Sequence, residues 1–545
     1  MANFLSLCPE LLLSILARLD DSSLAALAAA SKAFPPYINP ILYHTADWTL
    51  YNDDNDGNPK YPLLDWFRTL CERPDLAALV KRVIFTSELD LWEPNTYSDC
   101  LSVSDKRRFR EAIDQLGPID FELELRAGVS TGNDDALKAV IFSILHNLEV
   151  LEIDYSLAHK FKLAGLAMQN AGAGSGTSSK VCLRNDKDVE AMRYDVNFEL
   201  LLSVFHIPSL ETIEMVLPEP RDSLWIDSAS GLNLPNLGTL RLLNSEASVK
   251  TLSKILAITP KLHTLEYNFV QDLDRVRFDE SYSEGHYDEW AALTVALSQV
   301  TQTLRDLTIS VAYHYNECMD TEDYDLEWVD RLWERRGCMG SLQSFAKLER
   351  LEIPLPVLLG WSPLPAKRLR NVLPYGLKEL CLRDDFVDLF EGYTYPWTPW
   401  ESDVSNQFEN LDWTFEDSVD CSPTIGVLHE YLTHKPEESQ LRHLILKQMQ
   451  GRHWPAHFVD EVSQLCRDGN VKGIFLWQAT NEGDEVIEVT VHDPSKPIGQ
   501  EFWGFEYRYL HLPRRRTFYH RCCTTTPEWE LRRSWEWVSG ECEDE

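Results

Sequence analysis

A short apolar motif recurs along this chain, with large side chains at positions i, i+3 and i+5. It reads LEVLEI, LETIEM, LGTLRL, LERLEI, LKELCL and LRHLIL in six of its eight copies. The copies begin at Leu148, Leu210, Leu237, Leu262, Leu304, Leu348, Leu377 and Leu441. The second and third positions alternate as in a β-strand, while the first leucine precedes the strand in a turn. A single copy cannot bury its own leucines, but stacked neighbouring copies can.

Helix-like stretches precede many of these predicted strands. They span Ala136 to Leu145, Phe198 to Phe205, Val249 to Ile258, and Trp290 to Val300. Repeated units of helix, turn and short strand predict an α/β fold with parallel strands, and they resemble the leucine-rich repeat. The copies are 25 to 64 residues apart and lack the regular asparagine of that family. We therefore expect an irregular solenoid of helix–strand units over residues 146–446, and an ordinary α/β domain is the alternative.

The amino terminus predicts three short helices. The first begins at Pro9 and Glu10, because proline fits the first turn and the helix dipole favours an acidic side chain there. Asp20 to Ser23 offer capping oxygens for the second helix. A third short piece surrounds Pro40 and ends near Trp48. Apolar side chains recur at helical spacing in the first two helices, at Leu11, Leu12, Ile15, Leu16, Leu19, Leu24, Leu27 and Ala28.

This amino-terminal segment holds more apolar surface than three short helices can bury among themselves. The charged residues between Met1 and Ala46 are Glu10, Arg18, Asp20, Asp21 and Lys32. Leu13, on the far side of the first helix, illustrates the surplus. Either another protein or the rest of this chain must cover the remaining leucines.

The segment from Leu5 to Trp48 resembles an F-box, as found at the start of many fungal proteins. Leu7, Pro9 and Glu10 match the opening Leu-Pro-x-Glu of that family, although Cys8 occupies the usual place of the proline. The apolar positions of the first family helix are matched by Leu11, Ile15, Leu16 and Leu19. Those of the second are matched by Leu24, Leu27, Ser31, Lys32 and Phe34.

The resemblance implies that these helices dock a Skp-type adaptor, which bridges to a cullin scaffold. The implied adaptor-binding residues are Leu7, Pro9, Glu10, Leu11, Ile15, Leu16, Leu19, Leu24 and Leu27, with Glu10 chiefly a helix-start residue. The expected function is a non-catalytic target-recognition subunit of a Skp–cullin–F-box ubiquitin ligase. A protein-interaction scaffold without ligase coupling and an uncharacterised enzyme remain as alternatives.

Charge and cysteine content limit the other function classes. The formal net charge of -36 disfavours nucleic-acid binding, and the dense basic run is short, at Arg514 to Arg516 and Arg521. The charge either keeps a large apolar protein soluble or recruits a basic partner. No CxxC pair, signal peptide or membrane-length apolar run is found in the sequence. A reducing cytoplasmic or nuclear location is expected.

The expected organisation has four parts. Residues 1–48 form the F-box-like module, 49–145 a linker and the start of the body, 146–446 the repeat array, and 447–545 a cap with an acidic tail. Polar or low-complexity linkers are expected at Asn52 to Asn58 and at Asn170 to Lys180. Tyr393 to Trp413 offers aromatic side chains that either anchor a partner or cover the edge of the array. Strands are expected from Gly473 onward.

The chain lacks a recognisable catalytic or metal-binding constellation. His453 and His457 have the spacing of one helical face, but Pro455 between them disfavours a helix there. His314 and Cys318 share that spacing without a supporting motif. No GxSxG, phosphate-binding loop or HExxH sequence occurs. Neither a cofactor nor a metal is expected.

Overall fold

The structure is a computed structural model of the 545-residue chain. It describes residues 7–48, 62–85, 100–116, 119–154, 162–172, 179–184, 204–205, 210–217, 233–272, 289–314, 334, 336–362, 368–386, 423–448, 456–478, 485–495 and 508–511. The predicted Phe198–Phe205 helix lies mostly outside these ranges. So do the Asn52–Asn58 linker, the Tyr393–Trp413 segment, the basic run from Arg514 and the acidic tail.

A 14-stranded sheet runs through the described part of the molecule, and its strands neighbour one another in chain order. The strands are β1 (Thr45–Asp47), β2 (Arg82–Phe85), β3 (Val150–Asp154), β4 (Ser179–Arg184), β5 (Leu210–Met215), β6 (Thr239–Ser245), β7 (Thr264–Asp272), β8 (Asp306–His314), β9 (Arg350–Pro354), β10 (Glu379–Arg383), β11 (His443–Gln448), β12 (Lys472–Gln478), β13 (Glu485–His492) and β14 (Arg508–His511). From β1 to β12 every pair is parallel, whereas β13 and β14 add antiparallel strands at the end. The fold is therefore mixed α/β with a mostly parallel sheet.

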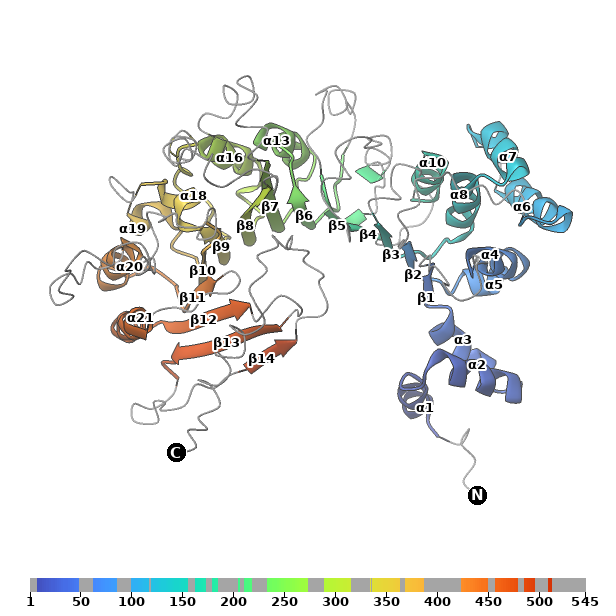
Figure 1. The fold of residues 1–545 in the computed structure, drawn as a ribbon, viewed down its shortest axis with the longest axis horizontal. Helices are drawn as coiled ribbons and strands as arrows, with labels where there is room; N and C mark the ends of the chain where they lie inside the picture. Colours follow the sequence, from blue (N-terminus) through green and yellow to red (C-terminus); the bar gives the residue numbers. More distant parts are fainter. Residues whose placement is uncertain are drawn as a thin grey trace, which may run out of the picture.

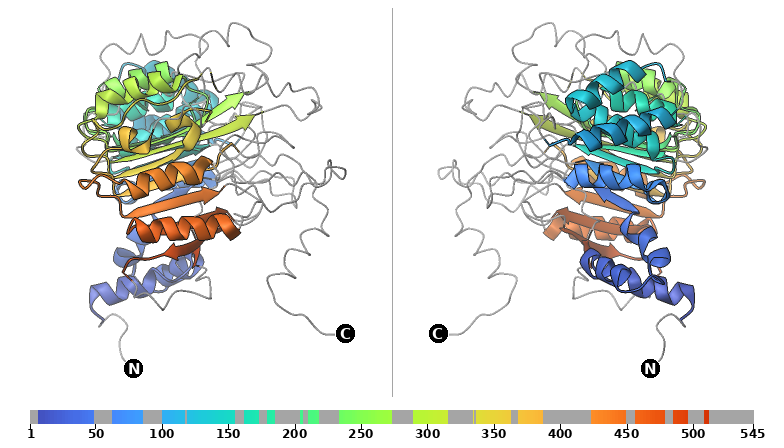
Figure 2. Two further views of the ribbon diagram at one scale, coloured as in Figure 1. Left: turned by 90° about the vertical axis from the view of Figure 1, so that its left-hand side faces the viewer. Right: turned by 90° about the vertical axis from the view of Figure 1, so that its right-hand side faces the viewer.

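The sheet bends into an open arc, with helices on its outer side and strands on its inner side (Figures 1 and 2). The helices are α1 (Pro9–Leu16), α2 (Asp21–Ala30), α3 (Pro35–Leu42), α4 (Pro62–Glu72), α5 (Pro74–Ala77), α6 (Val103–Gln115), α7 (Glu122–Thr131), α8 (Asp134–Ile144), α10 (Lys162–Gly172), α13 (Val249–Ala257), α16 (Glu289–Leu297), α18 (Leu355–Leu359), α19 (Leu369–Val372), α20 (Pro423–Thr433) and α21 (Ala456–Asp468), with a 3-10 turn η4 (Ser298–Val300). The predicted helices over Ala136–Leu145, Val249–Ile258 and Trp290–Val300 are confirmed, with the last ending in η4.

The predicted leucine motif coincides with the strands, and its copies stack in register. The i+3 residues of the eight copies pair along one ladder, in which Val181 of β4, a strand outside the predicted copies, stands between the first two. The order is Leu151, Val181, Ile213, Leu240, Leu265, Leu307, Leu351, Leu380 and Leu444. None of these side chains is more than 2% exposed. One continuous apolar core between the sheet and its helices results from this stacking.

The i, i+3, i+5 spacing also occurs with apolar side chains other than leucine. These sets extend the row of repeated strands toward the amino terminus. Tyr43, Ala46 and Trp48 form such a set around β1, and Val80, Val83 and Phe85 form one around β2. Ala46, Trp48, Val83 and Phe85 are each buried in the core of the sheet. Thr45 to Trp48, which the sequence grouped with residues 1–48, thus lie in the sheet. Residues 62–85, 100–116 and 119–145 form helices and a strand, so this part of the range 49–145 belongs to the body.

Two further predictions concern segments near strands. The proposed linker from Asn170 to Lys180 was too long, because α10 continues to Gly172 and β4 begins at Ser179. Lys180 hydrogen-bonds through its backbone N–H to the Glu149 carbonyl, which fixes the start of that strand. The strands predicted from Gly473 onward are confirmed as β12 and β13, which pair antiparallel.

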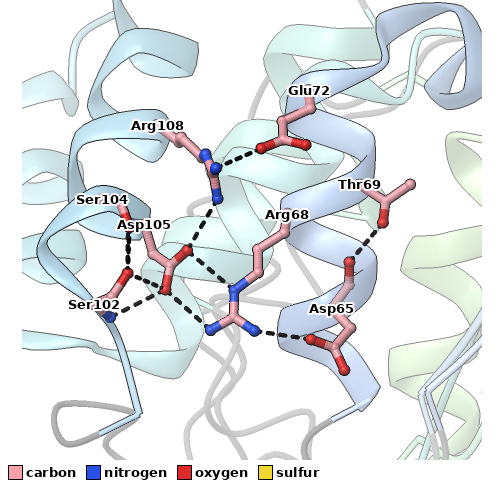
Figure 3. A network of polar contacts seen from close by, with 8 residues as sticks. All are labelled: Asp65, Arg68, Thr69, Glu72, Ser102, Ser104, Asp105 and Arg108. Atoms are coloured by element: carbon pink, nitrogen blue, oxygen red, sulfur yellow. Dashed lines mark hydrogen bonds and ion pairs between the residues drawn. The ribbon is translucent and has the colours of Figure 1, made fainter.

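An ionic network around the buried Asp105 carboxylate joins α4 to α6 at the amino-terminal part of the arc (Figure 3). Arg68 Nε and Nη2 each donate to the Asp105 carboxylate at 3.0 Å. Ser102 caps α6 by accepting the Asp105 N–H, while Asp105 accepts from the Ser102 N–H, a reciprocal capping box. Arg108 adds a 2.6 Å ion pair to Glu72. These contacts fix how α6 packs against α4.

The Asp105 carboxylate predicts a measurable pH dependence of stability. Burial raises its pKa, but hydrogen bonds from Arg68 and Ser102 outweigh that effect and lower the pKa from 3.8 to about 2. Because ionised Asp105 is favoured in the folded state, its contribution is present above pH 4 and is lost as the pH falls toward 2. We expect Asp105→Asn to lower the free energy of unfolding at neutral pH by about 2 kcal/mol.

Urea unfolding of the wild type and of the variant at a series of pH values checks this expectation. The difference between the two proteins should shrink as the pH falls from 4 to 2. Asp65→Asn is the matched control, since Asp65 also pairs with Arg68 but its side chain is 79% exposed. That control should cost less than about 0.5 kcal/mol. Equal losses in both variants would contradict the assigned role of Asp105.

Candidate protein-docking surface

The helices α1, α2 and α3 form a small apolar cluster of their own. Its buried side chains are Leu12, Leu16, Leu24, Phe34 and Ile38, separate from the core of the sheet. Figure 1 shows these helices at one end of the arc, beyond β1. We call them the amino-terminal module. Its core is so small that it leaves much of the apolar surface of α1 unburied.

The first two helices begin where the sequence predicts, next to residues that favour a helix start. Cys8 precedes α1, Pro9 occupies its first turn, and Glu10 adds an acidic side chain there. The Asp20 carboxylate caps α2 by accepting the Ser23 N–H at 2.8 Å. Hydrogen bonds from the Ser22 hydroxyl and from Ser23 lower the Asp20 pKa to about 2. Local side-chain signals thus set the residues at which both helices begin.

Large apolar side chains remain exposed on and beside α1. Their exposed fractions are 36% for Leu7, 56% for Leu11, 40% for Leu13, 40% for Ile15 and 39% for Leu19. Exposed leucines and isoleucines are individually unremarkable, but five within thirteen residues of one short segment form a patch. Patches of this kind on a soluble protein mark contact sites.

The helical repeat divides these side chains into two flanks. Leu12 and Leu16 point into the module, one turn apart. Leu11 and Ile15, also four residues apart, lie on one flank of that buried line, and Leu13 lies on the other. We call Leu7, Leu11, Ile15 and Leu19 the α1 ridge. These residues belong to the predicted docking set and are accessible together.

Not every predicted docking residue lies on this surface. Leu16 and Leu24 are 0% and 1% exposed, so they pack inside the module and support the ridge without reaching a partner. Leu27 is half-buried against the same core, while Pro9 and Glu10 are exposed at the start of α1. The apolar spacing alone could not separate core from surface, because both sets recur every three to four residues.

The module joins the sheet directly through the end of α3. The His44 carbonyl accepts hydrogen bonds from the N–H groups of Lys81 and Arg82, each at 3.0 Å. The Tyr43 ring packs edge-on against Trp66 of α4, with 5.3 Å between ring centroids. Within the described part of the chain, the body does not cover the α1 ridge, whose side chains stay exposed.

Sequence reasoning missed a second dense basic run, Lys106 to Arg110 in α6. Arg108 pairs with Glu72 and Asp105, and Arg107 lies 3.5 Å from the Glu111 carboxylate. Arg110 donates to the Ser130 hydroxyl at 2.9 Å. Most of this run is therefore engaged within the protein and does not form a free basic patch.

No metal site or membrane span is found among the described residues. Within that part of the chain, no group of three or more His, Cys, Asp or Glu side chains is arranged to hold a metal ion. None of the described helices combines the length and apolar character that crossing a bilayer requires. The histidine pairs raised by the sequence lie outside the described side chains, although α21 begins at Ala456, directly after Pro455.

No model of a known protein family matches this chain, and no curated protein sequence does so either.

Proposed function

We propose that this protein is the target-recognition subunit of a Skp–cullin–F-box ubiquitin ligase. In this proposal the amino-terminal module is an F-box that docks a Skp-type adaptor through the α1 ridge. The arc is an irregular leucine-rich-repeat solenoid that holds a protein target. The observation that carries this proposal is the apolar ridge that stays exposed on a module whose own core is too small to bury it.

The ordered resemblance of residues 7–34 to an F-box supports this choice of partner. Leu7, Pro9 and Glu10 begin the first helix as in that family, and the exposed ridge contains Leu11 and Ile15. An apolar ridge of this kind gains free energy when a partner covers it, roughly 25 cal/mol for each Å² of apolar surface removed from water. The surrounding helices need no rearrangement to expose it.

The proposed mechanism is one of proximity and not of chemistry by this chain. The module is fixed to the sheet through β1 and the Tyr43–Trp66 contact, so adaptor and target are held on one framework. Holding a target beside a ubiquitin-transferring enzyme raises its effective concentration without any new bond to this protein. No cofactor is part of the proposal, and the proposed setting is the cytoplasm or nucleus.

The test is co-purification of the full chain with a Skp-type adaptor. We expect Leu11→Asp combined with Ile15→Asp to weaken adaptor binding at least about a hundredfold, since two desolvated apolar anchors become charged. Both side chains are exposed, so the module should keep its fold. Leu13→Asp is the matched control, because Leu13 is 40% exposed and lies on the other flank of the same helix.

Circular dichroism of each variant reports whether α1 to α3 remain folded. Adaptor binding that survives the double substitution would show that the ridge is not the docking surface. A wild-type chain that binds no Skp-type adaptor would instead favour a scaffold without ligase coupling.

A further inference from the structure

The amino ends of the parallel strands lie along one edge of the sheet, and in the carboxyl-terminal half this edge is rich in cations. Each of five consecutive strands begins with or just after a basic residue: Arg305, Arg350, Lys378, Arg442 and Lys472. We call these residues the amino-edge strip. Neighbouring strands lie about 4.8 Å apart, so the strip is about 20 Å long.

Backbone hydrogen bonds fix the strip across segments far apart in the sequence. The Arg305 carbonyl accepts from the Arg350 N–H at 3.0 Å, and the Lys378 carbonyl accepts from the Arg442 N–H at 2.9 Å. The Arg442 carbonyl in turn accepts from the Lys472 N–H at 2.8 Å. The spacing of the cations is therefore set by the sheet and not by flexible loops.

Three carboxylates lie among these cations, and each has a basic partner. The pairs are Arg350 Nε to Asp306 Oδ1 at 2.7 Å, Lys378 Nζ to Glu349 Oε2 at 2.9 Å, and His443 Nδ1 to Glu379 Oε2 at 3.6 Å. Two of the five strip cations are thereby matched inside the protein.

The other three cations are surplus. Among the residues that the structure describes, no carboxylate forms an ion pair with Arg305, Arg442 or Lys472. Arg305 and Arg442 are exposed, and Lys472 is half-buried. A positive strip is unexpected on a chain whose formal net charge is -36, since solubility alone needs no such segregation.

The charged side chains further along the strands behave differently. Glu352 receives ion pairs from both Arg383 and Lys447, and Arg241 lies between Glu214 and Glu266. Lys447 and Arg383 lower the Glu352 pKa to about 2, although burial opposes them. Those charges neutralise one another within the fold, whereas the amino-edge strip carries an excess that a partner can use.

We infer that the amino-edge strip is a docking surface for an acidic polypeptide segment of a partner protein. Carboxylates of such a segment complement Arg305, Arg442 and Lys472. Its backbone N–H groups match Asp306, Glu349 and Glu379, which accept hydrogen bonds. A nucleic-acid backbone fits this surface less well, because its phosphates meet those carboxylates and it offers them no backbone donors. The inference is independent of adaptor docking by α1.

The experiment is fluorescence-polarisation binding of the full chain to a labelled Glu-rich peptide, with a Gln-rich peptide for comparison. Binding of the Glu-rich peptide should weaken with added salt. Arg305→Glu combined with Arg442→Glu should weaken it at least about tenfold, because two attractions become repulsions. The matched control is Lys162→Glu with Lys250→Glu, two exposed positions on α10 and α13 that change the total charge equally.

The control should bind the peptide within about twofold of the wild type, because charges beyond a Debye length are screened. Equal weakening in both double variants would overturn the inference. It would mean that peptide binding depends on the net charge of the protein and not on the position of the cations. Tighter binding of single-stranded DNA of matched charge, or no binding of the Glu-rich peptide, would also overturn it. Arg305→Gln with Arg442→Gln, compared by circular dichroism, separates lost docking from lost folding.

Discussion

In Leu307→Ala we expect the free energy of unfolding to fall by about 3 kcal/mol. Leu307 occupies the i+3 position of β8 and is 1% exposed. It stands in register between Leu265 of β7 and Leu351 of β9, at the centre of the leucine ladder. Truncation removes buried methyl groups and leaves a cavity that neighbouring strands cannot close without losing register.

The next residue provides the matched control. Thr308 lies on the same strand but faces the opposite side of the sheet, between Glu266 and Glu352. Thr308→Ala should cost less than about 1 kcal/mol. Urea unfolding followed by far-ultraviolet circular dichroism measures both variants. Similar costs at the two positions would contradict the assignment of the leucine face as the core.

Arg336→Ala is expected to cost about 3–5 kcal/mol, because it removes the cation that faces a buried carboxylate. Arg336 is 1% exposed, and its Nη1 lies 3.0 Å from Glu289 Oε2 on α16. The guanidinium lies over the rings of Phe269 and Trp290, 5.3 Å and 5.9 Å from their centroids. It also donates to the Gln271 side chain of β7.

A second pair of variants separates charge from packing at this site. Arg336→Met keeps most of the side-chain volume but leaves the charge on Glu289, so it should remain strongly destabilised. Adding Glu289→Gln removes that charge, and the double variant should recover at least about 1 kcal/mol. Thermal unfolding of the wild type, Arg336→Met, Glu289→Gln and the double variant measures the coupling. Additive losses would show that the ion pair contributes little.

Local patterns sufficed to predict the eight strands β3 and β5 to β11, and also to predict which of their side chains are buried. The i, i+3, i+5 spacing works because alternation along a strand is fixed by backbone geometry wherever the strand lies. It failed at β1 and β2, where Tyr43, Trp48, Val80 and Phe85 fill the same positions without leucine. In these two strands the motif positions require a buried apolar side chain, but that side chain need not be leucine.

The amino-terminal module was only partly determined by its sequence. Pro9 and Asp20 mark the helix starts through capping, which is a local effect. The choice between Leu11 and Leu12, or Ile15 and Leu16, as surface or core depends on where α2 and α3 pack. That choice decides which residues a partner can reach.

The sequence by itself determined an α/β chain of repeated helix–strand units with an apolar amino terminus. The tertiary structure decided the chain-order stacking of the strands, the burial of Arg336 against Glu289, and the line of cations from Arg305 to Lys472. Side-chain periodicity is a property of residues that are neighbours in the sequence, so it can be recognised in a single segment. Ion pairs and charged strips join residues tens of positions apart, and they exist only once hydrogen bonds between strands bring those segments together.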